Sequence, residues 1–143
     1  MRLPEQIQHF IHPTLLVLAD HVHAKIWFAH EDEISEIAHL TVPHELKSDN
    51  EGSFMSSAES VGQPEQKEKQ HHLNVLIKHI AEALSKELEN RDVTYIDMIM
   101  PADILHPLEL EFPKTTIAMI NRRLEADLIK EDILQVAKRL FTK

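Results

Sequence analysis

Three short apolar runs, each bounded by polar residues, occupy the first part of the chain at residues 14–19, 24–29 and 34–42. The first run is continuous, which is typical of a strand buried on both faces. In the third run, alternate residues fall on opposite faces, as in a strand. Because the connections between the runs are only a few residues long, we predict an antiparallel meander of three strands.

The longest helical pattern begins at Pro64, a residue that suits the first turn of a helix. Apolar residues then recur at three- and four-residue steps from Leu73 to Leu88, which predicts a helix over 64–89 with one apolar face. The other predicted elements are a short helix over 4–11 within an N-terminal extension (1–13), a strand over 93–100, a helix over 101–110, a strand over 115–124 and a final helix from 130 onward.

The predicted order is therefore βββαβαβα within a single domain over residues 14–143. A strand–helix–strand unit of this length is most easily a parallel crossover. Joined to the antiparallel meander, it gives an α/β fold with a mixed sheet and helices packed on it.

Composition is that of one ordinary globular domain, with 143 residues, 43% hydrophobic residues and no cysteine. No apolar run is long enough to span a bilayer, and the N-terminus lacks the layout of a signal peptide, so we expect a cytoplasmic protein without membrane insertion. The absence of cysteine excludes disulfides and thiol chemistry. The sequence does not indicate an oligomeric state.

The net charge of −9 argues against broad attraction to nucleic acid. Residues 1–112 carry 8 basic and 20 acidic side chains, a net of −12, whereas residues 113–143 carry 7 and 4, a net of +3. A small basic patch is one interpretation of the C-terminal part, and a solvated helix face is the favoured one. The basic residues concerned are Arg122, Arg123, Lys130, Lys138 and Arg139.

The only two glycines of the chain, Gly52 and Gly62, both lie between the third predicted strand and the long helix. Asp49, Asn50 and Gly52 form a strong turn signal. The serine- and acid-rich composition predicts that 46–63 is a mobile loop. Its binding candidates are Asp49, Asn50, Gly52, Gly62 and Gln63, which either shape a contact surface or only turn the chain.

The order and spacing of several short motifs resemble the bacterial host-attachment family, whose members are named as required for attachment to host cells. The motifs are 18–20 (LAD), 24–28 (AKIWF), 46–52 (LKSDNEG), 95–102 (YIDMIMPA) and 124–128 (LEADL). The resemblance covers most of 14–141. It implies a relationship to the middle domain of eukaryotic and archaeal peptide release factors, and a ribonuclease-H-like order of elements.

In the release-factor relatives, a Gly-Gly-Gln loop precedes the long helix and enters the peptidyl-transferase centre of the ribosome. This chain has Val61-Gly62-Gln63 at the equivalent place. The resemblance implies that Gln63 could position a water against an ester carbonyl. Val61 replaces the first glycine, however, and a β-branched residue restricts the backbone there.

Three carboxylates are candidates for a divalent-cation site of a nuclease. Asp20 follows the first strand, and Asp97 and Asp103 lie in and after the fourth, with Glu68 as a further candidate from the long helix. A turn residue is the favoured alternative for Asp20. The chain also has 11 histidines, including His21, His23, His71 and His72, but no zinc-ligand spacing.

Two functions of different classes follow. The first is a non-catalytic binding module without a cofactor, acting on the ribosome, RNA or another protein through loop 46–63. The alternative is a hydrolase, either of a peptidyl-tRNA-like ester through Gln63 or of nucleic acid through Asp20 and a divalent cation.

Overall fold

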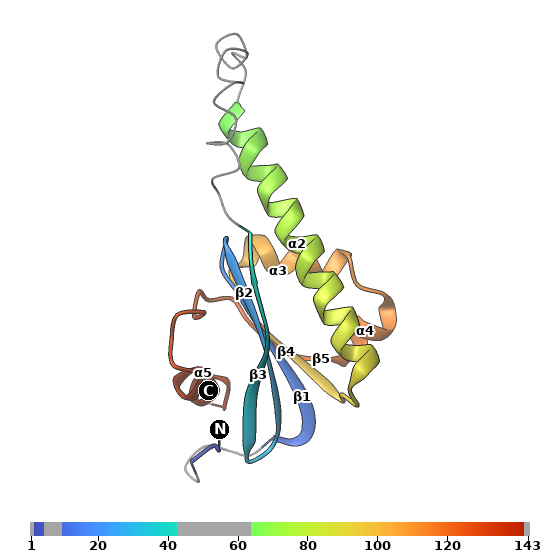
Figure 1. Ribbon diagram of the computed structural model, residues 1–143, viewed down its shortest axis with the longest axis vertical. Coiled ribbons are helices and arrows are strands. Elements are labelled where there is room, and N and C mark those ends of the chain that lie inside the picture. The colour runs from blue at the N-terminus through green and yellow to red at the C-terminus, as the bar shows by residue number, and fades with distance from the viewer. Residues whose placement is uncertain (1, 5–9, 43–63, 142–143) are drawn as a thin grey trace.

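The computed structural model describes residues 2–4, 10–42 and 64–141. Its centre is a five-stranded mixed sheet of order β3-β2-β1-β4-β5 (Figure 1). The strands are β1 (Phe10–Ala19), β2 (His23–Glu31), β3 (Glu33–Thr41), β4 (Tyr95–Ile99) and β5 (Ile120–Leu124). β1 to β3 form an antiparallel meander, and β4 and β5 run parallel to β1. Both the meander and the parallel crossover are therefore confirmed.

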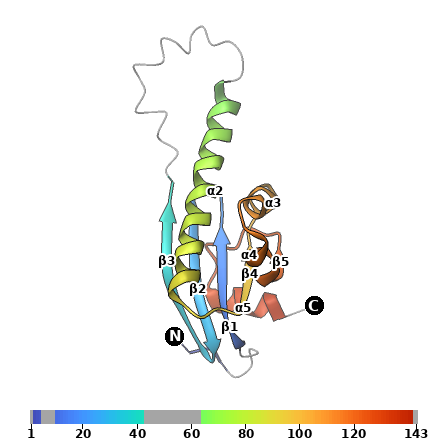
Figure 2. The same cartoon turned by 90° about the vertical axis from the view of Figure 1, so that its right-hand side faces the viewer.

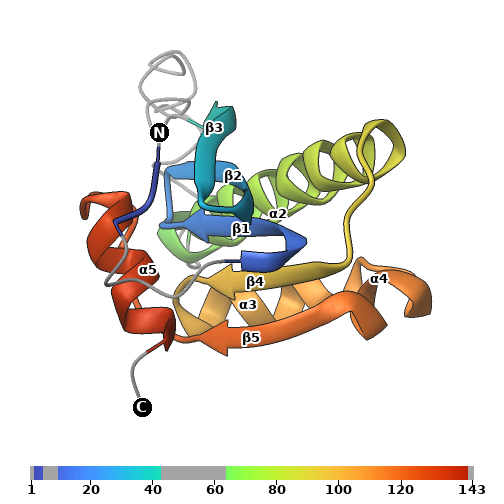
Figure 3. The same cartoon turned by 90° about the horizontal axis from the view of Figure 1, so that it is seen from below.

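Helices cover both faces of the sheet, as Figures 1 and 3 show. The described helices are α2 (Pro64–Asn90), α3 (Ala102–Leu110), α4 (Lys114–Met119) and α5 (Ile133–Phe141). α2 and α3 pack on one face, and α5 packs on the other. The predicted helix over 64–89 is confirmed, and so is the α/β class. None of the described helices is long and apolar enough to cross a membrane.

The continuous apolar run in β1 divides between two cores. Leu15, Val17 and Ala19 join the core beneath α2 and α3, whereas Leu16 and Leu18 join the core beneath α5. All five side chains are almost completely buried. A strand covered on both faces needs apolar residues at every position, which explains the run.

The helix predicted over 4–11 is wrong at Phe10 and Ile11, which belong to β1. Phe10 pairs with Glu31 of β2, and an irregularity between Phe10 and Thr14 accommodates Pro13. Leu3 and Phe10 are buried in the core beneath α5. Pairing with β2 therefore overrides the helical spacing that the apolar residues of this segment suggest.

The strand predicted over 115–124 is wrong in its first half, because Lys114–Met119 form α4 and only Ile120–Leu124 form β5. The β-branched residues at 115–117 favour a strand by propensity. Instead, the carbonyl oxygen of Pro113 accepts hydrogen bonds from the backbone N–H groups of Thr116 and Ile117, at 3.0 and 3.1 Å. These local bonds begin a helical turn, so one more helix precedes β5 than the predicted order contained.

Candidate functional site

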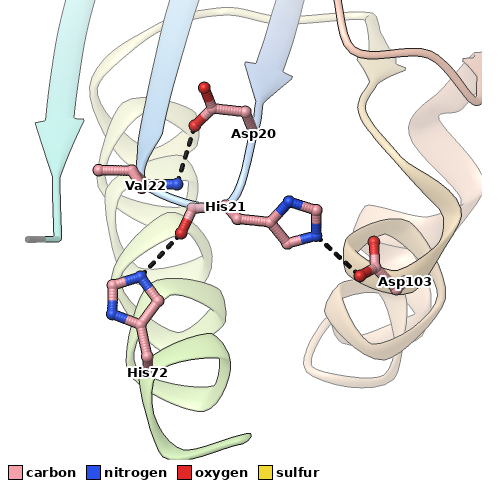
Figure 4. A network of polar contacts seen from close by, with 5 residues as sticks. All are labelled: Asp20, His21, Val22, His72 and Asp103. Atoms are coloured by element: carbon pink, nitrogen blue, oxygen red, sulfur yellow. Dashed lines mark hydrogen bonds and ion pairs between the residues drawn. The ribbon is translucent and has the colours of Figure 1, made fainter. Parts of the chain in front are cut away.

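The carboxyl end of β1 is a tight turn built around Asp20. Its Oδ1 accepts hydrogen bonds from the backbone N–H groups of Val22, at 2.8 Å (Figure 4), and His23, at 2.6 Å. Partial burial would raise the pKa of Asp20, but the two N–H groups and the neighbouring His23 together lower it. The interpretation of Asp20 as a turn residue is thus confirmed, since its carboxylate reverses the chain into β2.

His21, in the same turn, connects β1 to two helices. Its Nε2 lies 2.7 Å from Oδ2 of Asp103, in the first turn of α3. Its backbone carbonyl accepts a hydrogen bond of 2.7 Å from Nε2 of His72, on α2 (Figure 4). Because a carbonyl oxygen can only accept, His72 carries its proton on Nε2. The turn, α2 and α3 are therefore held together at this edge of the sheet.

The three candidate carboxylates do not share one site. Asp20 binds its own turn, Asp103 contacts His21, and Asp97 lies 3.4 Å from a guanidinium nitrogen of Arg122 on β5. Strand alternation places Asp97 on the face of β4 that points to α5, with Ile99. No group of three His, Asp or Glu side chains within the described residues could hold a metal ion. The side chain of Glu68 lies outside the described part.

Asp97 is completely buried in the middle of the sheet. Burial raises the pKa of Asp97 to about 6, although the charge and hydrogen bonds of Arg122 oppose the shift. Asp97 is paired directly with Arg122 across the β4–β5 ladder. The carboxylate of Asp97 therefore affects the stability of the fold. It is not accessible to a substrate in solution.

The basic residues of the C-terminal part are partly neutralised. Arg123 makes a two-pronged contact with Glu109, at 2.7 and 3.3 Å, and Arg122 contacts Asp97. A charge that is balanced by a neighbouring acid contributes little to long-range attraction. The described contacts therefore agree better with a solvated helix face whose charges are partly paired than with a basic patch that binds nucleic acid.

The first turns of α2 extend past the tips of β1 and β2 in both side views (Figures 1 and 2). The helix has 27 residues, so its length is about 40 Å. His72 is the first buried side chain in the part of α2 whose side chains the structure describes, and Gln70, His71 and Asn74 beside it are exposed. Roughly 12 Å of helix therefore precede His72. We call residues 64–74 the projecting part of α2, whose base includes His72, bonded to the β1–β2 turn, and Leu73, packed against the core beneath α2.

The loop candidates Asp49, Asn50, Gly52, Gly62 and Gln63 lie outside the described residues. Only the described residues at the two ends of their segment, Val42 and Pro64, indicate where it joins the fold. Segment 43–63 joins Val42, after β3, to Pro64 at the tip of the projecting part of α2. Any contact surface in this segment is thus attached to the most extended end of the molecule.

Residues 15–140 match the family described as "Protein required for attachment to host cells". The chain belongs to this family. No curated protein shows significant similarity to it. In this host-attachment-family protein, the match covers the whole sheet from Leu15 onward, the projecting part of α2 and the turn of Asp20 and His21.

Sequence reasoning missed the contacts of His21 because its partners are far away in the chain. His21 and Asp103 are 82 residues apart, and His21 and His72 are 51 residues apart. The only local signal was that a polar Asp-His pair follows a buried strand, where α/β sheets commonly place functional groups. That signal locates the edge of the sheet but does not identify the helices that meet there.

Asp20→Ala is expected to lower the free energy of unfolding of this host-attachment-family protein by about 1.5–3 kcal/mol at pH 7, since the turn loses a charged acceptor of two backbone N–H groups. Urea denaturation measures the change. Asp127→Ala, which removes an exposed carboxylate after β5, is the control. If Asp20→Ala were as stable as the wild type, the carboxylate of Asp20 would not be needed for the turn.

Proposed function

We propose that this host-attachment-family protein is a non-catalytic binding module that engages the translation machinery through the projecting part of α2 and the adjoining segment 46–63. The observation that carries the proposal is the projection itself. A helix normally buries one face along its length, because packing provides most of its stability. Here the first turns extend beyond the sheet (Figure 2), and Gln70, His71 and Asn74 at their base are exposed.

The anchoring of α2 supports this use of the helix. Below the projecting part, Leu76, Ile80 and Leu84 are buried against the sheet. At the boundary, the hydrogen bond from His72 to the carbonyl of His21 fixes the helix to the β1–β2 turn. A rigidly anchored helix presents its tip in one orientation, which reduces the entropy lost on binding.

Charge favours a protein surface over RNA as the contact. The projecting part (64–74) has two acidic and two basic side chains, a net charge of zero, and segment 46–63 has three acidic and one basic, a net of −2. This surface therefore has no excess of positive charge to attract phosphates, and its slight negative charge favours a basic protein surface. We therefore propose that the partner is a basic protein of the ribosome.

The release-factor resemblance supports the same location. In those relatives, the loop before the long helix enters the ribosome, and segment 46–63 occupies the corresponding position in this chain. Loss of the first glycine at Val61 argues against inherited ester hydrolysis. The hydrolase alternative has no support from the carboxylates, because Asp20, Asp97 and Asp103 each contact a different group.

Co-sedimentation with purified ribosomes tests the proposal. Replacing Gln70, His71 and Asn74 together by alanine is expected to weaken binding at least tenfold, which corresponds to about 1.4 kcal/mol. The matched control replaces Lys78, Glu82 and Ser85, which are exposed on the anchored part of the same helix, and it should bind as the wild type does.

Deleting residues 48–60 separates the two parts of the proposed surface. A loss of binding on deletion, with the helix variant also impaired, assigns the contact to both parts. Absence of ribosome binding by the wild-type protein would contradict the proposed partner. If the helix variant and the deletion variant both bound ribosomes as tightly as the wild type, the proposed surface would be contradicted.

A further inference from the structure

A pair of histidines lies on the α5 side of the antiparallel meander, at the end of β2 and β3 that adjoins the β1–β2 turn. In the β2–β3 ladder, His23 pairs with Thr41 and Lys25 pairs with His39. Residues paired across a ladder share a face, so His23 and His39 are diagonal neighbours on one face. Their ring centroids are 6.0 Å apart, with an angle of 46° between the ring planes.

This face is the one opposite α2 and α3, because Ala24 and Leu40, the intervening pair, contact the core beneath those helices. Both rings are accessible to solvent on it. The side chain of His23 is 38% exposed, and His39 is exposed. An ion in solution can therefore reach both imidazoles without any rearrangement of the core.

Asp20 supplies a carboxylate beside one of the rings. Its Oδ1 lies 3.6 Å from Nδ1 of His23. This distance is too long for a hydrogen bond, but it places a negative charge beside the imidazole, which favours a bound cation.

We propose that His23 and His39 form a two-imidazole site for a divalent transition-metal ion of the zinc type. Two imidazoles bound to one ion at the usual Zn–N distance have ring centroids about 5 Å apart at a tetrahedral N–metal–N angle and about 6 Å apart at an angle of about 140°. The observed separation of 6.0 Å corresponds to the wider angle. Imidazole ligands select zinc, copper or nickel over magnesium and calcium. Water fills the remaining positions, since no third ligand of the described part completes the site.

Lys25 determines how tightly this site holds the ion. It is paired directly with His39, so its ammonium group lies on the same face as the two rings. A neighbouring positive charge disfavours a bound cation. The site therefore combines one favourable charge, from Asp20, with one unfavourable charge, from Lys25. Its role is to bridge β2 and β3, and it does not depend on ribosome binding.

Isothermal titration of the full-length protein with Zn²⁺ at pH 7.5 tests the site. Loss of an outer carboxylate partner typically lowers metal affinity ~10–100-fold, so loss of a ligating imidazole should lower it at least as much. We expect His23→Gln and His39→Gln each to weaken zinc binding at least about tenfold. The double variant should bind zinc at least as weakly as either single variant, because it retains neither ligand of the one ion.

His79→Gln is the matched control, because it removes an exposed histidine from α2, far along the chain from the pair. It should leave this zinc site unchanged. Lys25→Gln is expected to strengthen zinc binding, an effect that misfolding cannot produce.

If His39→Gln bound zinc as tightly as the wild type, the proposal would be overturned, even if other histidines of the chain also bind zinc. A stoichiometry that falls in each single variant while the affinity of the remaining site stays unchanged would also overturn it, because the rings would then bind separate ions. Unchanged or weaker binding in Lys25→Gln would contradict the predicted position of the ion between the two strands.

Discussion

Asp97→Asn is expected to raise the free energy of unfolding at pH 7.5 by up to about 3 kcal/mol, the equivalent of a pKa shift of about two units. The pKa of Asp97 is raised to about 6 by burial in the sheet. Above that pH, folding keeps a charged carboxylate away from water. Asparagine has nearly the same shape, keeps an oxygen for Arg122 and carries no charge, so the variant avoids this cost.

The sign of the pH dependence follows from proton binding. Between the ordinary carboxyl pKa and about 6, the folded protein holds a proton on Asp97 that the unfolded chain has released. The contribution of Asp97 to stability is therefore complete at low pH and is lost as pH rises through about 6. Near pH 4, Asp97→Asn and the wild type should be almost equally stable.

Urea denaturation of both proteins from pH 4 to 8 measures this difference. Asp127→Asn, which removes an exposed carboxylate, is the control and should show no such trend. A lower stability of Asp97→Asn at pH 7.5 would contradict the prediction. It would mean that the attraction between Asp97 and Arg122, whose side chain is 36% exposed, exceeds the cost of burial.

Leu76→Ala is expected to lower the free energy of unfolding by about 2–5 kcal/mol, because a fully buried leucine leaves a cavity when it is truncated. Leu76 lies one turn after His72 and is a fully buried side chain of α2 in the core beneath this helix. The change therefore tests the anchoring on which the projecting part depends.

Chemical denaturation measures the effect, with Lys78→Ala as the control. Lys78 is exposed two residues further along the same helix, and its replacement should change stability by less than about 0.5 kcal/mol. If Leu76→Ala were as mild as the control, α2 would not pack on the sheet through this face, and its projecting part would have no fixed orientation.

The sequence was sufficient for the elements whose patterns are long and uniform. The apolar steps from Leu73 to Leu88 predicted α2, and the two-sided burial of β1 explains why its apolar run is continuous. It was insufficient where local and long-range signals compete. The β-branched residues before β5 favoured a strand, but hydrogen bonds to Pro113 begin a helix there.

The candidate site was predictable in its location but not in its contacts. Asp20 was recognisable as a turn residue because an aspartate after a buried strand commonly binds nearby N–H groups. The pairing of Asp97 with Arg122 depends on a shift in the β4–β5 register, which spacing along the chain does not reveal. The helices that meet at His21 likewise come together only through the fold.

Ribosome co-sedimentation of the wild type and of the Gln70, His71 and Asn74 triple-alanine variant, at equal concentration and salt, tests the proposed function most directly. The proposal predicts that the wild type sediments with ribosomes, that the triple variant binds at least about tenfold more weakly, and that the Lys78, Glu82 and Ser85 control behaves as the wild type. Failure of the wild type to bind ribosomes would contradict it.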